Sequence, residues 1–204
     1  MLEAINLECV RGERRLFHNL SFQLKAGECL LVHGENGSGK TSLLRTLVGL
    51  TPPATGAVHW QSSSIKKLGD EYRRELLYCG HPLGLKGGLS ATENLIWSMA
   101  LADELVSEDA VHEALGQAGL RGREHLSARA LSQGQKRRVN LARLLLQKRA
   151  LWVLDEPLTA LDTQASLWVA RVVDQHLSNG GIAVLTTHQD LTLAGTTHVI
   201  RVGV

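Results

Sequence analysis

The sequence predicts an α/β fold, with a core of buried parallel strands and helices, an antiparallel β subdomain and a helical subdomain. Three observations predict it. Apolar and polar residues alternate in short runs up to about residue 32, continuous apolar runs occur farther along, and a helical period dominates from about 82 to 130. The stretches that read as buried strands are 27–32, 151–154 and 182–187. We expect a single domain over residues 1–204, with its helical subdomain at approximately 82–140.

The composition indicates a soluble globular protein without a strong charge preference. Of the 204 residues, 44% are hydrophobic, and the net charge of +2 does not favour a nucleic acid as partner. The three cysteines form no CxxC pair, so reduced structural thiols are expected rather than disulfides or a zinc site. No apolar run reaches the roughly 18 residues that span a bilayer. Any membrane association is therefore expected to depend on a partner.

The N-terminal region is expected to form strands of a half-exposed antiparallel layer, because residues 16–24 alternate between apolar and polar side chains. Residues 27–32 read instead as a buried parallel strand, and 42–48 as a helix. A turn cluster at 51–56 then precedes one more predicted strand at 57–60. Strands of both kinds are thus predicted before residue 60.

Between the buried strand and the first helix, residues Gly34–Thr41 fit the phosphate-loop pattern GxxxxGK[ST]. In such a loop successive backbone N–H groups turn inward and, with the N-terminus of the next helix, bind phosphate oxygens. Lys40 is expected to reach the β and γ phosphates, and the Thr41 hydroxyl to hold Mg²⁺. The candidate nucleotide-binding residues here are Gly34, Glu35, Asn36, Gly37, Ser38, Gly39, Lys40, Thr41 and Ser42.

The helical stretch contains two predicted helices. The first opens with a capping box, in which the Ser90 hydroxyl accepts from the Glu93 amide, and runs through Leu105. The second runs from Ala110 to Leu120 and closes near Gly119. The predicted buried face of the first helix contains Leu95, Ile96, Met99 and Ala102.

Two later apolar strands end in residues that suit nucleotide hydrolysis. Residues 151–154 are followed by Asp155 and Glu156, whose side chains point to opposite faces and can take different roles. Asp155 can hold Mg²⁺, and Glu156 can accept a proton from the water that attacks the γ phosphate. The strand at 182–187 ends at His188, on the same expected edge of the sheet. The alternative is that these are solvated residues at strand ends.

The motifs taken together resemble those of ATP-binding subunits of ABC transporters. The phosphate loop, Leu131–Gln135 (LSQGQ), 151–157 (LWVLDEP), 159–162 (TALD) and His188 stand in that family's order. The resemblance implies a P-loop NTPase core of the RecA type, a helical subdomain with the ABC signature, and ATP hydrolysis with Mg²⁺.

The resemblance also implies a head-to-tail dimer, because the signature motif contacts ATP held by a second copy of the chain. Ser132, Gly134 and Gln135 belong to this motif, and Asp162 would pass between the two sites. His188 would contact the γ phosphate.

Two positions depart from the family pattern. Where a glutamine is usual, before the helical subdomain, the chain has His81, which could ligate Mg²⁺ or donate a hydrogen bond to the attacking water, or could slow hydrolysis. Where an aromatic residue usually stacks on adenine, the chain has Arg11, whose guanidinium could stack instead, with Phe17 as a second candidate.

Among ABC subunits, the chain is most similar to the haem-exporter ATPases of cytochrome c maturation, through 9–12, 79–86, 89–95 and 180–191. This implies a peripheral protein on the cytoplasmic face of a bacterial inner membrane, bound to CcmB-, CcmC- and CcmD-like subunits and indirectly to the haem chaperone CcmE. Its ATP hydrolysis would export haem or release the loaded chaperone, and no direct haem binding is expected.

Other functions fit the motifs less well. Within transport the alternative is another cargo, such as a lipoprotein or an amino acid. A kinase would have no use for LSQGQ, and non-transport ABC proteins usually carry long insertions or a second nucleotide-binding domain.

Overall fold

The computed structural model describes residues 1–189 and 191–203 of the chain. The chain forms two compact units. The first unit comprises Met1–Gly80, Arg149–Glu156 and Val173–Val204, and the second comprises His81–Lys148 and Pro157–Val172. The helical subdomain predicted at approximately 82–140 falls within the second unit, which also includes residues that follow the carboxylates.

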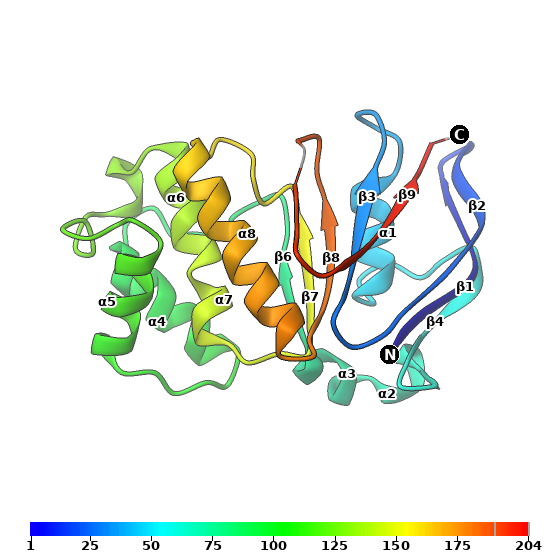
Figure 1. The fold of residues 1–204 in the computed structure, drawn as a ribbon, viewed down its shortest axis with the longest axis horizontal. Coiled ribbons are helices and arrows are strands. Elements are labelled where there is room, and N and C mark those ends of the chain that lie inside the picture. The colour runs from blue at the N-terminus through cyan, green and yellow to red at the C-terminus, as the bar shows by residue number, and fades with distance from the viewer. Residues whose placement is uncertain (190, 204) are drawn as a thin grey trace. The chain divides into compact units, whose positions relative to one another are not determined.

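An antiparallel sheet in the first unit has the strand order β2-β1-β4-β5 (Figure 1). Its strands are β1 (Leu2–Arg11), β2 (Arg14–Leu24), β4 (Thr55–Trp60) and β5 (Ser63–Ser64). The alternating pattern therefore predicted the antiparallel layer correctly.

A parallel sheet of five strands, in the order β6-β7-β8-β3-β9, forms the rest of the first unit's framework. Its strands are β3 (Glu28–His33), β6 (Leu76–Cys79), β7 (Leu151–Asp155), β8 (Ile182–Thr186) and β9 (Thr196–Arg201). Thr186 at the end of β8 pairs with Asp155 on one side and with Val32 on the other. The carboxyl ends of β3, β7 and β8 thus meet at one edge, where the polar residues follow the strands.

The sequence predicted β3, β7 and β8, whose middle residues are all buried, but not β6 or β9. Strand β6 has only four residues, and β9 is largely exposed along one edge of the sheet. Neither therefore produces the continuous apolar run that identifies a central parallel strand.

Three helices accompany these sheets in the first unit: α1 (Lys40–Leu47), α2 (Ile65–Leu68) and α3 (Asp70–Glu75). Helix α1 follows the phosphate loop as predicted and buries Leu43, Leu44 and Leu47. The buried Tyr72 hydroxyl donates to the Leu47 carbonyl at 2.7 Å, which satisfies one of the free carbonyls at the end of α1.

The second unit contains the helices α4 (Ala91–Leu101), α5 (Glu108–Gln117), α6 (Gln133–Leu141) and α7 (Arg143–Leu146). A 3₁₀ turn, η1 (Ala128–Ala130), precedes α6, and α8 (Thr163–Ser178) continues from this unit into the first. The capping box at Ser90 and Glu93 is confirmed. Among the described residues, no helix combines the length and apolarity needed to cross a bilayer.

Two details of the first predicted helix were wrong. Helix α4 ends at Leu101 rather than at Leu105, because Asp103 adopts a left-handed backbone (φ 61°) that ends the helical path. Leu95 and Met99 are buried as predicted, whereas Ile96 is 38% exposed. The buried face instead includes the polar Asn94, whose amide donates to the carbonyls of Leu89 and Ser90 and so fixes the turn before the helix.

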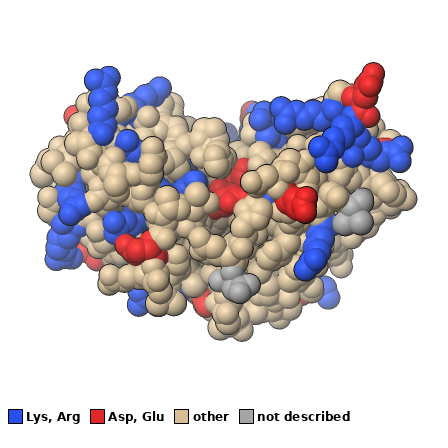
Figure 2. Space-filling model, turned by 90° about the horizontal axis from the view of Figure 1, so that it is seen from above, with Lys and Arg blue, Asp and Glu red and all other residues tan. Residues whose placement is uncertain are grey.

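The cysteines and the charged surface agree with the composition. The three cysteines are free thiols, and all of them are buried. Figure 2 shows Lys and Arg side chains interspersed with Asp and Glu on the face that it presents.

Candidate nucleotide-binding site

The phosphate loop has a backbone that only glycine tolerates at its critical positions. Gly34, Gly37 and Gly39 have φ of 153°, 79° and 107°. A Cβ on Gly34 would lie 2.5 Å from Ser38 Oγ and 2.6 Å from the Val202 carbonyl. The buried Ser38 Oγ finds no hydrogen-bond partner among the described residues. A tight loop of this kind can bind the phosphate groups of a nucleotide, and a phosphate oxygen would give the Ser38 hydroxyl its missing hydrogen-bond partner.

Lys40 lies at the start of α1 and is 7% exposed. Its Nζ donates to the carbonyls of Gly34 at 2.8 Å and Glu35 at 3.1 Å. The same Nζ lies 3.0 Å from His188 Nε2 and 3.9 Å from Glu156 Oε1. The structure therefore brings together three predicted residues that are far apart in the sequence.

Asp155 ends β7 with its carboxylate 1% exposed and held on both oxygens. The Thr41 hydroxyl donates to Oδ2 at 2.9 Å, and the Thr186 hydroxyl donates to Oδ1 at 2.8 Å. The site thus presents a carboxylate next to the hydroxyl of the phosphate loop, an oxygen donor set that suits Mg²⁺. Nowhere in residues 1–189 and 191–203 do three His, Cys, Asp or Glu side chains form a metal-binding group. A cation here would rely on these two residues and on the phosphates themselves.

Glu156 has a left-handed backbone, with φ of 52°, at the turn after β7. Such a conformation costs a residue other than glycine about 1–3 kcal/mol and is common where function fixes a side chain. The Oε1 atom of Glu156 lies 2.9 Å from His188 Nε2, so the predicted base and the histidine expected to contact the γ phosphate are in direct contact.

The hairpin of β1 and β2 packs against the phosphate loop. A Cβ on Gly39 would lie 3.0 Å from Leu16 Cβ and 3.4 Å from Phe17 Cδ1. Phe17 is 5% exposed and belongs to the hydrophobic core, so it offers no free ring face and the suggestion that it stacks on adenine is wrong. Arg11 is exposed at the end of β1 and stays a prediction.

Cys9 on β1 lies close to Ser42 on α1. Burial raises the pKa of its thiol, although a hydrogen bond with Ser42 and the charge of Arg11 act in the opposite direction. The thiol is therefore a packed structural group rather than a reactive thiolate.

The signature residues lie at the start of α6 in the second unit. Ser132 Oγ accepts from the Gln135 amide at 3.2 Å, and Gln135 Oε1 accepts from the Ser132 amide at 2.9 Å. A Cβ on Gly134 would lie 2.4 Å from the Ala160 carbonyl, so only glycine fits there. Asp162 accepts from the Ala165 amide at 2.8 Å and so caps α8.

His81 is exposed at the beginning of the second unit. The predicted site residues therefore divide into two sets. Those on the phosphate loop, β7 and β8 belong to the first unit, whereas His81, the signature residues and Asp162 belong to the second. Each set has a defined geometry within its own unit.

The sequence missed one residue of this site, Thr186. Its hydroxyl contacts both Asp155 and the backbone of Glu156. The signal that could have found it is a pair of threonines, Thr186 and Thr187, at the end of an otherwise apolar strand.

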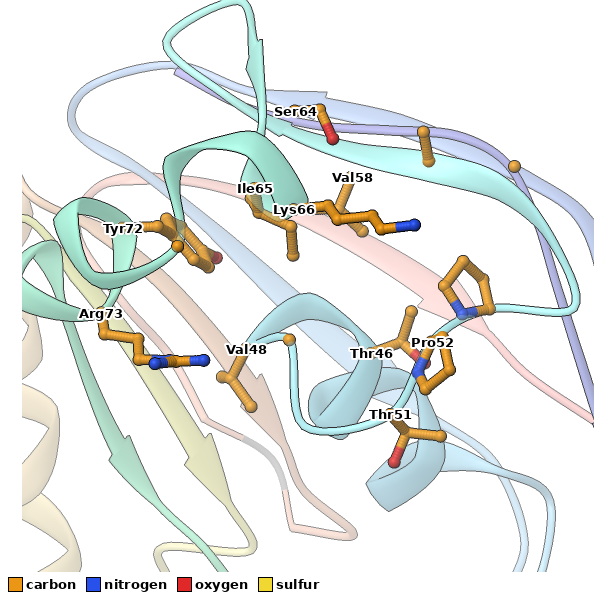
Figure 3. Close-up of a pocket in the computed structure, with 15 residues that line it drawn as sticks. Thr46, Val48, Thr51, Pro52, Val58, Ser64, Ile65, Lys66, Tyr72 and Arg73 are labelled. Atoms are coloured by element: carbon orange, nitrogen blue, oxygen red, sulfur yellow. The ribbon is translucent and has the colours of Figure 1, made fainter.

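A cavity of about 370 Å³ lies at the other end of α1 and is separate from this chemistry. Figure 3 shows Thr46 and Val48 on one side of it and Val58, Ile65 and Tyr72 on the other. None of the predicted nucleotide-binding residues lines this cavity.

Comparison with known proteins agrees with the motifs and with the fold. Residues 17–159 match the family model described as ABC transporter. The cytochrome c biogenesis ATP-binding export protein CcmA of Dechloromonas aromatica (strain RCB) is 55% identical over 204 residues, covering 100% of both chains. The protein of the same name from Pseudomonas aeruginosa is 53% identical over 203 residues, again covering 100% of both.

Among solved structures, a dimer of the ATP-binding cassette MJ0796 in a post-hydrolysis state, bound to ADP and Pi, has a TM-score of 0.81. It is 24% identical, and the match covers 93% of this chain and 88% of that one. This likeness shows the fold, and it confirms the expected P-loop NTPase architecture. From the motifs, the family model and the two relatives together, the chain belongs to the ABC transporter family, as an ATP-binding subunit.

Proposed function

We propose that the chain is the ATP-hydrolysing subunit of a membrane ABC complex for cytochrome c biogenesis, acting in haem export or in release of a haem-loaded chaperone. The observation that carries the assignment is identity of 55% and 53%, over the whole of both chains, to export proteins named for that process. At 55% over 204 residues, the identical positions outnumber those of the motifs that all ABC subunits share.

In the proposed reaction, the phosphate loop binds the phosphates of ATP through its backbone N–H groups and the Lys40 ammonium. Thr41 and Asp155 would hold Mg²⁺, which supplies positive charge for the oxygens of the β and γ phosphates. Glu156 accepts the proton of the attacking water, and His188 holds the Glu156 carboxylate at 2.9 Å. His81 would orient the attacking water or bind the cation.

The complete site is proposed to require two copies of the chain, arranged head to tail. Ser132, Gly134 and Gln135 would contact the γ phosphate of ATP on the other copy, and Asp162 would lie between the two sites. The position of these residues at the N-terminus of α6 supports this role, because N–H groups in the first turn of a helix can bind phosphate oxygens. The fold is shared with a cassette that forms a dimer.

A membrane subunit is proposed to bind the second unit around Trp97. A cavity of about 280 Å³ there is lined by Leu83, Leu85, Trp97 and Leu101. Trp97 and Leu101 are 41% and 68% exposed. Large apolar side chains that are exposed around a cavity are typical of a protein interface. The occupants would be CcmB-, CcmC- and CcmD-like proteins, which would hold the chain at the cytoplasmic face of the inner membrane.

The Trp97→Ala variant tests this docking surface. It should lower recruitment to membranes that contain the partner subunits by about tenfold, because a central aromatic anchor commonly contributes 1–2 kcal/mol or more. ATP binding by the purified chain should not change.

The Trp168→Ala exchange is unsuitable as a control, because Trp168 is buried, with only 8% of its surface exposed. Leu167→Ala removes an exposed apolar side chain elsewhere and is the better control. Equal recruitment of the Trp97 variant and wild type would contradict this interface.

The function itself is tested by complementation. In a bacterium that lacks its own cytochrome c biogenesis ATPase, the wild-type chain should restore covalently bound haem in c-type cytochromes, and Lys40→Ala should not. Haem staining of membrane proteins measures the result. A wild-type chain that hydrolyses ATP and binds membranes but restores no c-type cytochrome would point instead to another cargo.

A further inference from the structure

Thr186 joins the two acidic residues of the site through a single hydroxyl group. It is fully buried at the end of β8, and it pairs with Asp155 across the sheet. Its Oγ1 donates to Asp155 Oδ1 at 2.8 Å and accepts from the backbone N–H of Glu156 at 2.8 Å.

These two hydrogen bonds fix the direction of the hydroxyl. A threonine hydroxyl has one proton to donate, and here the carboxylate of Asp155 accepts it, so the N–H of Glu156 must meet a lone pair of the same oxygen. The bond to an ionised carboxylate is the stronger kind, and burial strengthens it further. The carboxylate and the backbone of the next residue are therefore held by the same atom.

Thr186 fixes a different feature of each of the two residues that it holds. Asp155 Oδ2 is fixed by Thr41, so the Thr186 bond sets the rotation of the carboxylate about its own axis. Glu156 has a left-handed backbone, and the hydrogen bond from its amide N–H to the Thr186 hydroxyl ties this strained turn to β8. Loss of the hydroxyl would relax both constraints at once.

We propose that Thr186 is a positioning residue that sets the orientation of the Asp155 carboxylate toward the metal–nucleotide complex and the turn that carries Glu156. The proposal rests on the proposed ATPase function, but it concerns one hydroxyl that the motifs of the site do not include. It predicts that the shape of the residue at 186 is less important than its oxygen.

The test compares Thr186→Val, which keeps the shape and removes the hydroxyl, with Thr186→Ser, which keeps the hydroxyl. Thr46→Val is the matched control, because Thr46 is 1% exposed and its hydroxyl donates to the Ser42 carbonyl at 3.0 Å, away from the carboxylates. All four proteins are compared by thermal unfolding, so that a general loss of folding is recognised.

Two readouts do not depend on turnover. In the presence of ADP, Mn²⁺ binding measured by electron paramagnetic resonance should weaken about tenfold in Thr186→Val, the scale typical for loss of a group that supports a metal ligand. Hydrogen exchange of the Glu156 amide should become at least about tenfold faster, because its acceptor is lost. Thr186→Ser should return both values to within about threefold of wild type, and Thr46→Val should change neither.

Wild-type values for both readouts in Thr186→Val would overturn the proposal. So would an equal loss in Thr186→Ser or in Thr46→Val, since the effect would then follow packing rather than the hydroxyl. A wild-type chain without ATPase activity would refute the proposed function instead, and the amide exchange of Glu156 would still decide whether Thr186 holds the turn.

Discussion

The exchange Glu156→Gln separates ATP binding from hydrolysis. It keeps the size of the side chain and replaces a carboxylate that accepts protons with an amide that does not. Lys40, Thr41 and Asp155 stay in place, so the phosphate-binding groups are retained. The variant removes the charge that lies 2.9 Å from His188 Nε2 and 3.9 Å from Lys40 Nζ.

The expected loss in turnover follows from the role of Glu156 as a general base. Such a base commonly contributes a factor of 10² to 10⁴, which corresponds to about 3–5 kcal/mol in the activation free energy. The affinity for ATP should stay within about threefold of wild type, or rise, because a negative charge near the γ phosphate is removed. If two copies close around ATP, the variant should also accumulate as a dimer.

Phosphate release measures turnover, and size-exclusion chromatography with ATP or ADP measures the dimer. Glu113→Gln is the control, because Glu113 lies on the surface of α5 and accepts from Gln117 at 3.1 Å, remote in sequence from the strand ends. A Glu156→Gln protein that hydrolyses ATP at the wild-type rate would refute the assignment of this residue as the base. A protein that loses ATP binding together with turnover would show that Glu156 supports the site rather than the chemistry.

Three further predictions test the loop, the core and the pH dependence. Gly34→Ala should weaken binding of a fluorescent ATP analogue at least about tenfold, because the new Cβ would lie 2.5 Å from a side chain and 2.6 Å from a carbonyl. Gly37→Ala should lose less affinity, because the space around Gly37 is open. A larger loss in Gly37→Ala than in Gly34→Ala would contradict the loop geometry. Tyr72→Phe should lower the free energy of unfolding in urea by about 1–3 kcal/mol, because the buried Leu47 carbonyl loses its donor, and an unchanged value would show that the bond contributes nothing. Burial lowers the pKa of His176 below its ordinary value, so the unfolded chain binds the proton first as the pH falls. Wild type should therefore lose stability below about pH 6.5 relative to His176→Phe, which keeps an aromatic ring against β7; urea unfolding at pH 8 and pH 5 measures this, and a constant difference would exclude His176 as the cause.

The sequence predicted the site residues that can be recognised from their own charge and their place directly after a strand or a glycine loop. Lys40, Asp155 and Glu156 follow strands or a glycine loop, and a charged residue directly after an apolar run is conspicuous. Thr186 was missed because threonine is common in strands for reasons of shape, and its role depends on pairing with a strand that lies about 30 residues earlier in the chain. The signal exists only once the register of β7 against β8 is known.

The helix after the capping box shows the corresponding limit for the fold. Its start was predicted from the reciprocal bonds of Ser90 and Glu93, which depend on neighbours three residues apart. Its end depends on the left-handed backbone of Asp103, and the sequence has no glycine or proline near this position that would predict the end. The start of the helix is therefore visible in the local sequence pattern, whereas its end before Asp103 and the 38% exposure of Ile96 are not.

The position of His188 links nucleotide binding to the orientation of Glu156. One nitrogen, Nε2, lies 3.0 Å from the Lys40 ammonium and 2.9 Å from a Glu156 carboxylate oxygen. The ammonium can only donate and the ionised carboxylate can only accept, so a bare Nε2 satisfies Lys40 and opposes Glu156, while a protonated Nε2 does the reverse.

Phosphate oxygens change this balance, because they accept hydrogen bonds from Lys40 more strongly than a neutral imidazole does. In the proposed reaction, a Lys40 that bonds to phosphate would leave His188 free to carry its proton on Nε2 and donate to Glu156, and the second carboxylate oxygen would accept from water. ATP binding and the preparation of the base would then be one event, coupled through a single imidazole nitrogen.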